Sequence, residues 1–208
     1  MIVKQDFIKF PLHLIFHPID AFWDLKSDNR GRLFVAFAAL ALTIVMMILQ
    51  KQYAGFLVNY IDPRTINSII EIATVAVPFF LWCTANWAVT TLMEGEGKFR
   101  EIVLATGYSL IPVILIYAPM IVISRFMVQE ETAFYYLFNS IAFFWFVLLL
   151  FIGMMTVHQY TVIKTIITMV LTLIVMGVIV FLGALVFSML QQLYEFGYNI
   201  YRELIFRT

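Results

Sequence analysis

The sequence predicts an all-α integral membrane protein, a polytopic helical bundle with an N-terminal interfacial amphipathic helix. Apolar residues make up 63% of the 208 residues and charged residues only 12%, whereas a soluble domain is about half apolar and about a quarter charged. Five long stretches also lack any acidic or basic side chain. The formal net charge is zero, so no overall field attracts nucleic acid, and we expect no nucleic-acid partner.

A helix needs about 20 residues to cross the hydrocarbon; the first uncharged stretch is slightly shorter than this, and the other four are longer. The last stretch is too long for a perpendicular span, so its helix should tilt strongly or project into the headgroups from Gln191. The stretches are Leu33 to Gln50, Ile72 to Met93, Ile102 to Ser124, Thr132 to Val157 and Thr165 to Tyr194.

The whole chain, residues 1–208, reads as one membrane domain, since its length leaves no room for a second sizeable one. Residues 1–31 are expected to form a cytoplasmic interfacial segment. Residues 32–194 would form the bundle of five spans, and residues 195–208 a short outer tail.

The segment before the first span is too interrupted by charges and prolines to cross a bilayer. Pro18 suits the first position of a short helix. From there Ile19, Phe22, Trp23 and Lys26 fall on one face, which is typical of a helix lying among lipid headgroups. Two interpretations stay open, a plain membrane anchor and a docking surface for a cytoplasmic partner.

The placement of Lys and Arg predicts a cytoplasmic N-terminus and, with an odd number of spans, a C-terminus on the outside. In this orientation eight basic residues are inside and five outside. The inner set is Lys4, Lys9, Lys26, Arg30, Arg32, Lys98, Arg100 and Lys164, and the outer set is Lys51, Arg64, Arg125, Arg202 and Arg207. We expect a multi-pass protein of the plasma (inner) membrane.

Catalytic and cofactor chemistry have little support in this sequence. Intramembrane acidic and basic residues mark proton relays and ion paths, and here they fall at the ends of the spans. Cys83 is the single cysteine, so no disulfide or metal spacing exists, and we interpret it as a small packed hydrophobe. His158, near the end of the fourth stretch, is interpreted as a structural histidine. We therefore expect no enzyme, no cofactor and no metal.

Polar residues and prolines inside the second and third stretches are the remaining candidates for function. The Asn86 amide must find a partner on another helix, either as helix–helix glue or as a ligand contact. Ser109 is expected to bond the carbonyl one turn back. Pro78 and Pro112 should kink their spans, which could bring Asn86, Tyr108, Ser109 and Pro112 to face one another.

The same region resembles the bacterial branch of the Yip family, the Ypt/Rab-interacting membrane proteins. The most specific part is Gly-x-Gly-x-Phe-Arg-Glu followed by Gly-Tyr-Ser-Leu-x-Pro. His17-Pro18 to Trp23 also looks like the segment that precedes the first span in that family. The family-motif residues are Pro18, Trp23, Asn86, Trp87, Gly95, Gly97, Phe99, Arg100, Tyr108, Ser109 and Pro112.

The resemblance implies five spans, a cytoplasmic N-terminus and an outer C-terminus. Eukaryotic relatives bind prenylated Rab GTPases, but a bacterial-type chain is not expected to have a Rab-type GTPase partner. We expect a non-enzymatic scaffold or accessory protein that binds another membrane protein, such as a transporter complex, or that forms a homo-oligomer in the lipid bilayer. The alternatives are a transporter or permease component for a neutral or amphiphilic substrate, and a lipid- or membrane-organising protein.

Overall fold

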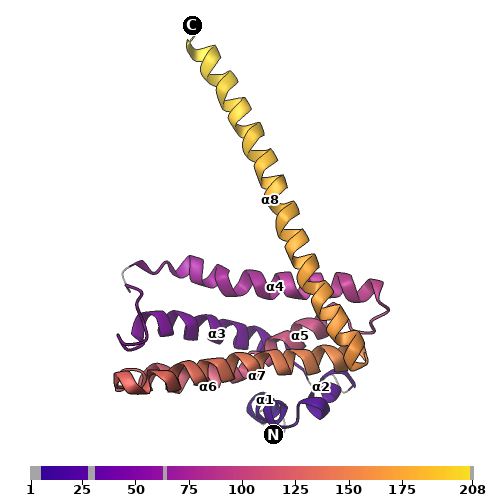
Figure 1. Cartoon of the computed structure of the whole chain (residues 1–208). Coiled ribbons are helices and arrows are strands. Elements are labelled where there is room, and N and C mark those ends of the chain that lie inside the picture. The colour runs from indigo at the N-terminus through magenta and orange to yellow at the C-terminus, as the bar shows by residue number, and fades with distance from the viewer. Residues whose placement is uncertain (1–5, 28–30, 63–64, 207–208) are drawn as a thin grey trace.

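The computed structural model describes residues 6–27, 31–62 and 65–206, and within these ranges it is all-α with no strand (Figure 1). Lys4, Arg30, Arg64 and Arg207 of the charge pattern lie outside the described residues. The helices are α1 (Asp6–Phe16), α2 (Pro18–Ser27), α3 (Leu33–Tyr53), α4 (Ser68–Leu92), α5 (Phe99–Ser109), α6 (Ile111–Ile123), the short 3₁₀ helix η2 (Gln129–Glu131), α7 (Thr132–His158) and α8 (Val162–Phe206).

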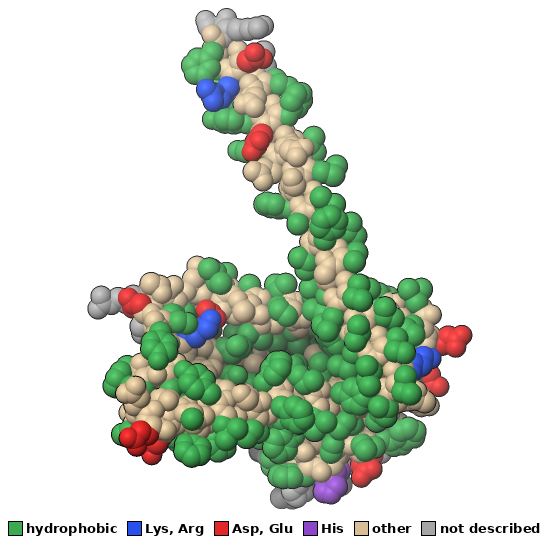
Figure 2. All heavy atoms as spheres, in the orientation of Figure 1, with side chains coloured by type: hydrophobic (Ala, Val, Ile, Leu, Met, Phe, Trp, Pro, Cys, Tyr) green, Lys and Arg blue, Asp and Glu red, His purple; other side chains and the backbone are tan. Residues whose placement is uncertain are grey.

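Five helical segments of the described chain are long and apolar enough to cross a membrane, as the sequence predicts. Each begins and ends within a few residues of the uncharged stretch that predicts it, except that the last continues further. Acidic and basic side chains gather at the two ends of the bundle and toward the tip of α8, while hydrophobic side chains cover the flank (Figure 2). The spans are Leu33–Tyr53, Ser68–Leu92, Phe99–Ile123, Gln129–His158 and Val162–Glu203.

The third span is built from two helices, because α5 ends at Ser109 and α6 begins at Ile111. At the junction, the Leu110 amide donates to the Gly107 carbonyl at 3.2 Å. Pro112 follows within the first turn of α6, where its missing N–H costs nothing. The predicted interruption of the third span is therefore confirmed. Pro78, by contrast, lies inside the single helix α4.

The N-terminal segment forms two helices that pack on the bundle. Pro18 is the first residue of α2, as predicted. The expectation that Phe22 shares a headgroup face with Trp23 is wrong. Phe22 is fully buried, together with Ala21 and Leu25, and its ring lies over Gly153 of α7. Burial of these apolar side chains in the core stabilises the attachment of α2 more than a headgroup contact would.

The last helix leaves the bundle. α8 contacts α4 and α7 near its start and then runs away from the other spans at a steep inclination (Figure 1). From Gly177 onward every described side chain of α8 is exposed. The helix continues to Phe206, so residues 195–206 of the expected outer tail are helical. The inclination agrees with the tilt that the length of its apolar stretch predicts.

Close approach of α3 and α5 depends on Gly107. A Cβ atom at this position would lie 2.6 Å from the Ala36 Cβ and 2.8 Å from the Ala36 Cα. The second of these is a backbone atom that cannot rotate away, so a methyl group forces the helices apart. Glycine here permits the contact that brings the third span against the first.

We expect Gly107→Ala to lower the free energy of unfolding by about 1–3 kcal/mol, the usual cost of overpacking a core. Gly177→Ala is the matched control, since it makes the same change in a helix with nothing within 4 Å and should be neutral or slightly stabilising. Denaturant unfolding in detergent micelles measures both. Equal effects of the two substitutions would contradict the assigned role of Gly107.

Candidate functional site

The loop between the second and third spans folds back onto the end of the fourth. The Gly97 amide donates to Nδ1 of His158 at 3.3 Å, and the Gly95 amide donates to the Thr90 carbonyl at 2.8 Å. His158 is buried at the end of α7. The loop that carries the family motif is therefore fixed by the histidine rather than free in solvent.

From His158 the hydrogen bonds continue into the bundle. Because Nδ1 accepts from Gly97, Nε2 carries the proton and donates to Oδ1 of Asn86 at 3.2 Å. The Asn86 amide nitrogen donates to Oγ1 of Thr172 at 3.2 Å, and that hydroxyl donates to the Thr168 carbonyl at 2.7 Å. We call Gly97, His158, Asn86 and Thr172 the polar junction. It joins the loop, α7, α4 and α8.

The His158 ring leaves no space for a side chain at Gly95 or Gly97 of the loop. A Cβ at Gly97 would lie 2.6 Å from Cε1 of His158, and a Cβ at Gly95 would lie 2.7 Å from its Nδ1. Neither glycine has a positive φ angle, so steric contact with the imidazole, not backbone freedom, accounts for both. The two motif glycines are thus explained by the histidine ring packed against them.

Tyr160 closes the same region from the following loop. Its ring stacks on the His158 ring with centroids 5.3 Å apart, and its hydroxyl donates to the Met93 carbonyl at 3.1 Å. Burial, and secondarily the nearby Glu94 carboxylate, raise the pKa of the Tyr160 phenol above its ordinary value. The phenol therefore stays protonated and remains a donor across the physiological range.

The side of the loop that faces away from His158 connects the polar junction to the N-terminal helices. Nζ of Lys26 on α2 lies 2.9 Å from the Glu96 carboxylate. Trp87 and Phe99 pack edge to face with centroids 6.0 Å apart. A displacement of the loop would therefore be transmitted to α2 through the ion pair between Lys26 and Glu96.

The other motif residues occupy a second region, where the third span meets the start of the first. The buried Tyr108 hydroxyl accepts from the Arg32 amide at 3.3 Å, and Phe10 packs edge to face on the Tyr108 ring at 5.7 Å. The Arg100 guanidinium lies 3.4 Å from the Gly31 carbonyl. These contacts fix the entry of the chain into α3.

The structure does not bring Asn86, Tyr108, Ser109 and Pro112 together. Asn86 bonds within the polar junction, while Tyr108 bonds to Arg32 and the Ser109 hydroxyl donates to the Ala105 carbonyl at 2.7 Å, one turn back as predicted. None of the four lines the apolar cavity of about 560 Å³ in the bundle. The interpretation of Asn86 as helix–helix glue describes its contacts. The convergence of the four residues, on which the transporter alternative depends, is not found among these contacts.

Sequence reasoning missed two members of the polar junction. His158 was placed at the membrane end as a structural residue, but its pairing with Asn86 and Gly97 spans 72 and 61 residues of sequence. Thr172 lies in an uncharged stretch with other threonines. The sequence indicates only that the buried Asn86 amide needs a hydrogen-bond partner on another helix, and it does not identify which residue is that partner.

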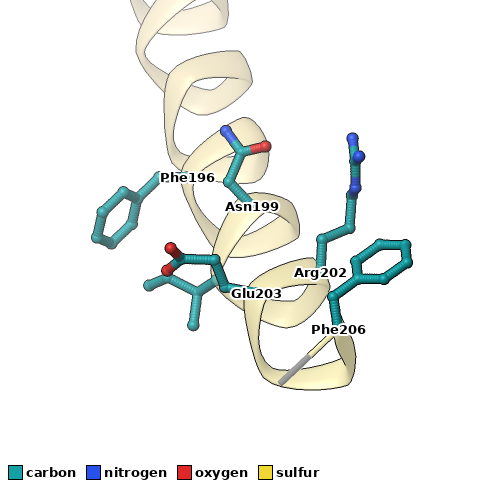
Figure 3. A pocket seen from close by; sticks show the side chains of 6 residues that line it. Phe196, Asn199, Arg202, Glu203 and Phe206 are labelled. Atoms are coloured by element: carbon teal, nitrogen blue, oxygen red, sulfur yellow. The ribbon is translucent and has the colours of Figure 1, made fainter. Parts of the chain in front are cut away.

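The described residues offer neither a metal site nor an enclosed ligand pocket near the tip of α8. No group of three or more His, Cys, Asp and Glu side chains is placed to hold a metal ion within the described residues. The hollow near the tip of α8 is lined by side chains of that helix alone, including Phe196, Asn199 and Glu203 (Figure 3). A ligand there would be unenclosed, because no second element covers it.

Comparison with known proteins gives one match. A family model described as the Yip1 domain matches residues 12–185, which is most of the chain and includes the polar junction. No curated protein and no solved structure matches the chain.

We expect Asn86→Leu to lower the free energy of unfolding by about 1–3 kcal/mol, because it leaves the Nε2–H of His158 buried without an acceptor. Hydrogen exchange at the Gly97 amide should also quicken, since the histidine loses its orientation. Detergent unfolding and mass-resolved exchange measure the two effects.

Thr84→Val is the control on the same helix, where an exposed hydroxyl bonds only to the Phe80 carbonyl one turn back. It should leave exchange at Gly97 unchanged. If Asn86→Leu destabilised the protein without altering exchange at Gly97, the loop would not depend on the polar junction.

Proposed function

We propose that this chain, which belongs to the Yip1 domain family, is a non-enzymatic accessory protein that binds another membrane protein through its N-terminal helices. One observation supports this most directly. Helices α1 and α2 are held by buried anchors, yet each exposes large apolar side chains on the opposite side. We call Leu12 and Phe16 of α1, with Ile19 and Trp23 of α2, the N-terminal face.

The N-terminal face is preorganised by the packing beneath it. Leu14 of α1 and Phe22 and Leu25 of α2 are at most 1% exposed, whereas Phe16 and Trp23 are 72% and 52% exposed. Helices held in this way lose little conformational freedom on binding, which favours affinity. Exposed aromatic side chains, tryptophan above all, supply much of the energy at protein interfaces.

The charges on α2 favour a protein partner over the lipid surface. Helices that bind anionic lipid carry several Lys or Arg on the polar face. α2 instead carries Asp20 and Asp24 beside one lysine among its described residues. That lysine, Lys26, is paired with Glu96. The segment is therefore poorly suited to a headgroup role alone.

We infer that the N-terminal face lies on the cytoplasmic side of the membrane. Eight Lys and Arg fall on the side of the bundle that holds α1 and α2, against five on the other side, which supports a cytoplasmic location for this end in the plasma (inner) membrane. The partner would be another membrane protein, such as a transporter complex, or a second copy of this chain. No Rab-type GTPase is proposed.

A transporter or permease component is the alternative with less support. It needs polar groups around a path through the bundle, and the polar residues proposed for it bond to their own neighbours, as described above. The apolar cavity contains neither Asn86 nor Tyr108. Both ring nitrogens of His158 are bonded to amide groups, of Gly97 and Asn86, and amides do not take up or release protons, so this geometry does not support a proton relay.

We expect a photoreactive phenylalanine analogue at position 16 or 23 to form one discrete protein adduct in native membranes, identified by mass spectrometry. The reason is the outward exposure of both side chains on anchored helices. The same analogue at Phe144, an exposed residue of α7, is the control for contact with bilayer lipid. Trp23→Ser should weaken the adduct formed from position 16.

Lipid adducts alone from positions 16 and 23 would favour the lipid-organising alternative and overturn the accessory role. Adducts identical to those from position 144 would do the same, since they would show no preference for the N-terminal face.

A further inference from the structure

An apolar cavity of about 560 Å³ opens between the spans where α8 diverges from α4 and α7. Hydrophobic side chains surround the recess below α4 in the view of Figure 2. Its walls come from α3, α4, the third span, α7 and α8, represented by Leu40, Phe79, Val113, Phe146 and Met169. The only polar groups on the walls are the hydroxyls of threonines and a tyrosine, together with the indole nitrogen of a tryptophan.

The depth of the cavity corresponds to one leaflet of a bilayer. Its wall along the third span runs from Thr106 to Tyr117, which is about 16 Å at the helical rise of about 1.5 Å per residue. Half of the hydrocarbon thickness is about 15 Å. Trp82, near the middle of α4, and Thr106 lie at the inner end of the cavity, and Tyr117 lies at its outer end.

A second hollow of about 360 Å³ adjoins the cavity at Tyr117, which lines both. Its lining combines apolar side chains such as Val58 and Ile61 with the polar side chains of Gln50, Lys51, Tyr135 and Asn139. Nε2 of Gln50 donates to the Tyr135 hydroxyl at 2.6 Å, so this lining is held in place. Hydrogen-bonding side chains and one lysine thus lie beside the apolar cavity at the level where a headgroup would lie.

Lys51 lines the second hollow, and its ammonium group is paired with Glu71, which stands behind it and is not part of the lining. Nζ of Lys51 lies 2.7 Å from the Glu71 carboxylate. The pair is neutral overall and can exchange partners with a phosphate and an ammonium group, which is the charge arrangement of a zwitterionic headgroup. An anionic lipid would leave Glu71 facing a like charge.

We propose that the cavity is a binding site for a zwitterionic phospholipid, with one acyl chain in the apolar cavity and the headgroup at Lys51 and Glu71. A leaflet-deep apolar site beside hydrogen-bonding side chains and a lysine matches this ligand in length and in polarity. No described part of the chain covers the cavity, because α8 leaves the bundle after Met176. The proposal does not depend on the accessory function proposed above.

Trp82 at the inner end gives a direct readout. In a variant that retains Trp82 and carries Trp23→Phe, Trp87→Phe and Trp145→Phe, brominated phosphatidylethanolamine should quench the fluorescence in detergent. Quenching should saturate near one lipid per protein. Bromines near the end of the chain should quench more than bromines near the ester, because the chain end reaches Trp82. A variant that retains only Trp87, which is exposed on α4 and does not line the cavity, should show no such saturation.

Matched substitutions separate the site from general lipid contact. Thr43 lines the cavity and Thr84 is exposed on α4, and each hydroxyl bonds to a carbonyl one turn back, at 2.9 and 2.8 Å. In the Trp82 background, Thr43→Phe should raise the lipid concentration needed for half-maximal quenching at least tenfold. Thr84→Phe should leave that concentration unchanged. Val147→Phe, from the α7 wall, gives a second blocked cavity if Thr43→Phe does not fold.

Linear quenching that never saturates, equal in Thr43→Phe and Thr84→Phe, would overturn the proposal, since Trp82 would then contact only the annular lipid. Stronger quenching by bromines near the ester would overturn the orientation of the chain. Equal saturation with brominated phosphatidylglycerol would overturn the headgroup assignment.

Discussion

The structure depends on the need of buried polar groups for partners where no water can reach them. The polar junction meets this need with an unbroken chain of donors from Gly97 through His158 and Asn86 to Thr172. Because its members belong to a loop and three different spans, satisfying one amide fixes the relative positions of α4, α7 and α8. Lys26 of α2 forms an ion pair with Glu96 of the same loop, which adds a surface contact to the buried packing that holds the N-terminal helices.

Small residues determine where the helices approach one another. Gly107 lets α5 contact the backbone of α3 at Ala36, and Gly153 leaves room on α7 for the ring of Phe22. In a membrane the hydrophobic effect does not distinguish a helix neighbour from lipid, so close backbone contact and interhelical hydrogen bonds carry the packing. The glycines of the family motif therefore have specific steric partners: the His158 ring for Gly95 and Gly97, and Ala36 for Gly107.

The fold was predictable because each span is an uncharged stretch of sufficient length, and the break before Pro112 follows from its missing N–H. The site was predictable only in part. Asn86 stood out as an amide in lipid, but its partners His158 and Thr172 are set by tertiary packing. On α2, helical periodicity placed Phe22 beside Trp23, and the structure separates them because only Phe22 faces Gly153. Nothing in one sequence shows which of two neighbouring aromatic residues meets a glycine on another helix.

The inclination of α8 and the apolar cavity have one geometric cause. The polar junction holds α8 to α4 at Thr172, and the walls of the cavity include α8 only as far as Met176. A last span parallel to α4 would continue along it and cover the opening. An uncharged stretch of about 45 Å at the usual helical rise is longer than the about 30 Å of hydrocarbon, so inclination lets it remain in the apolar layer. The length of the last span therefore determines the opening of the bundle toward the lipid.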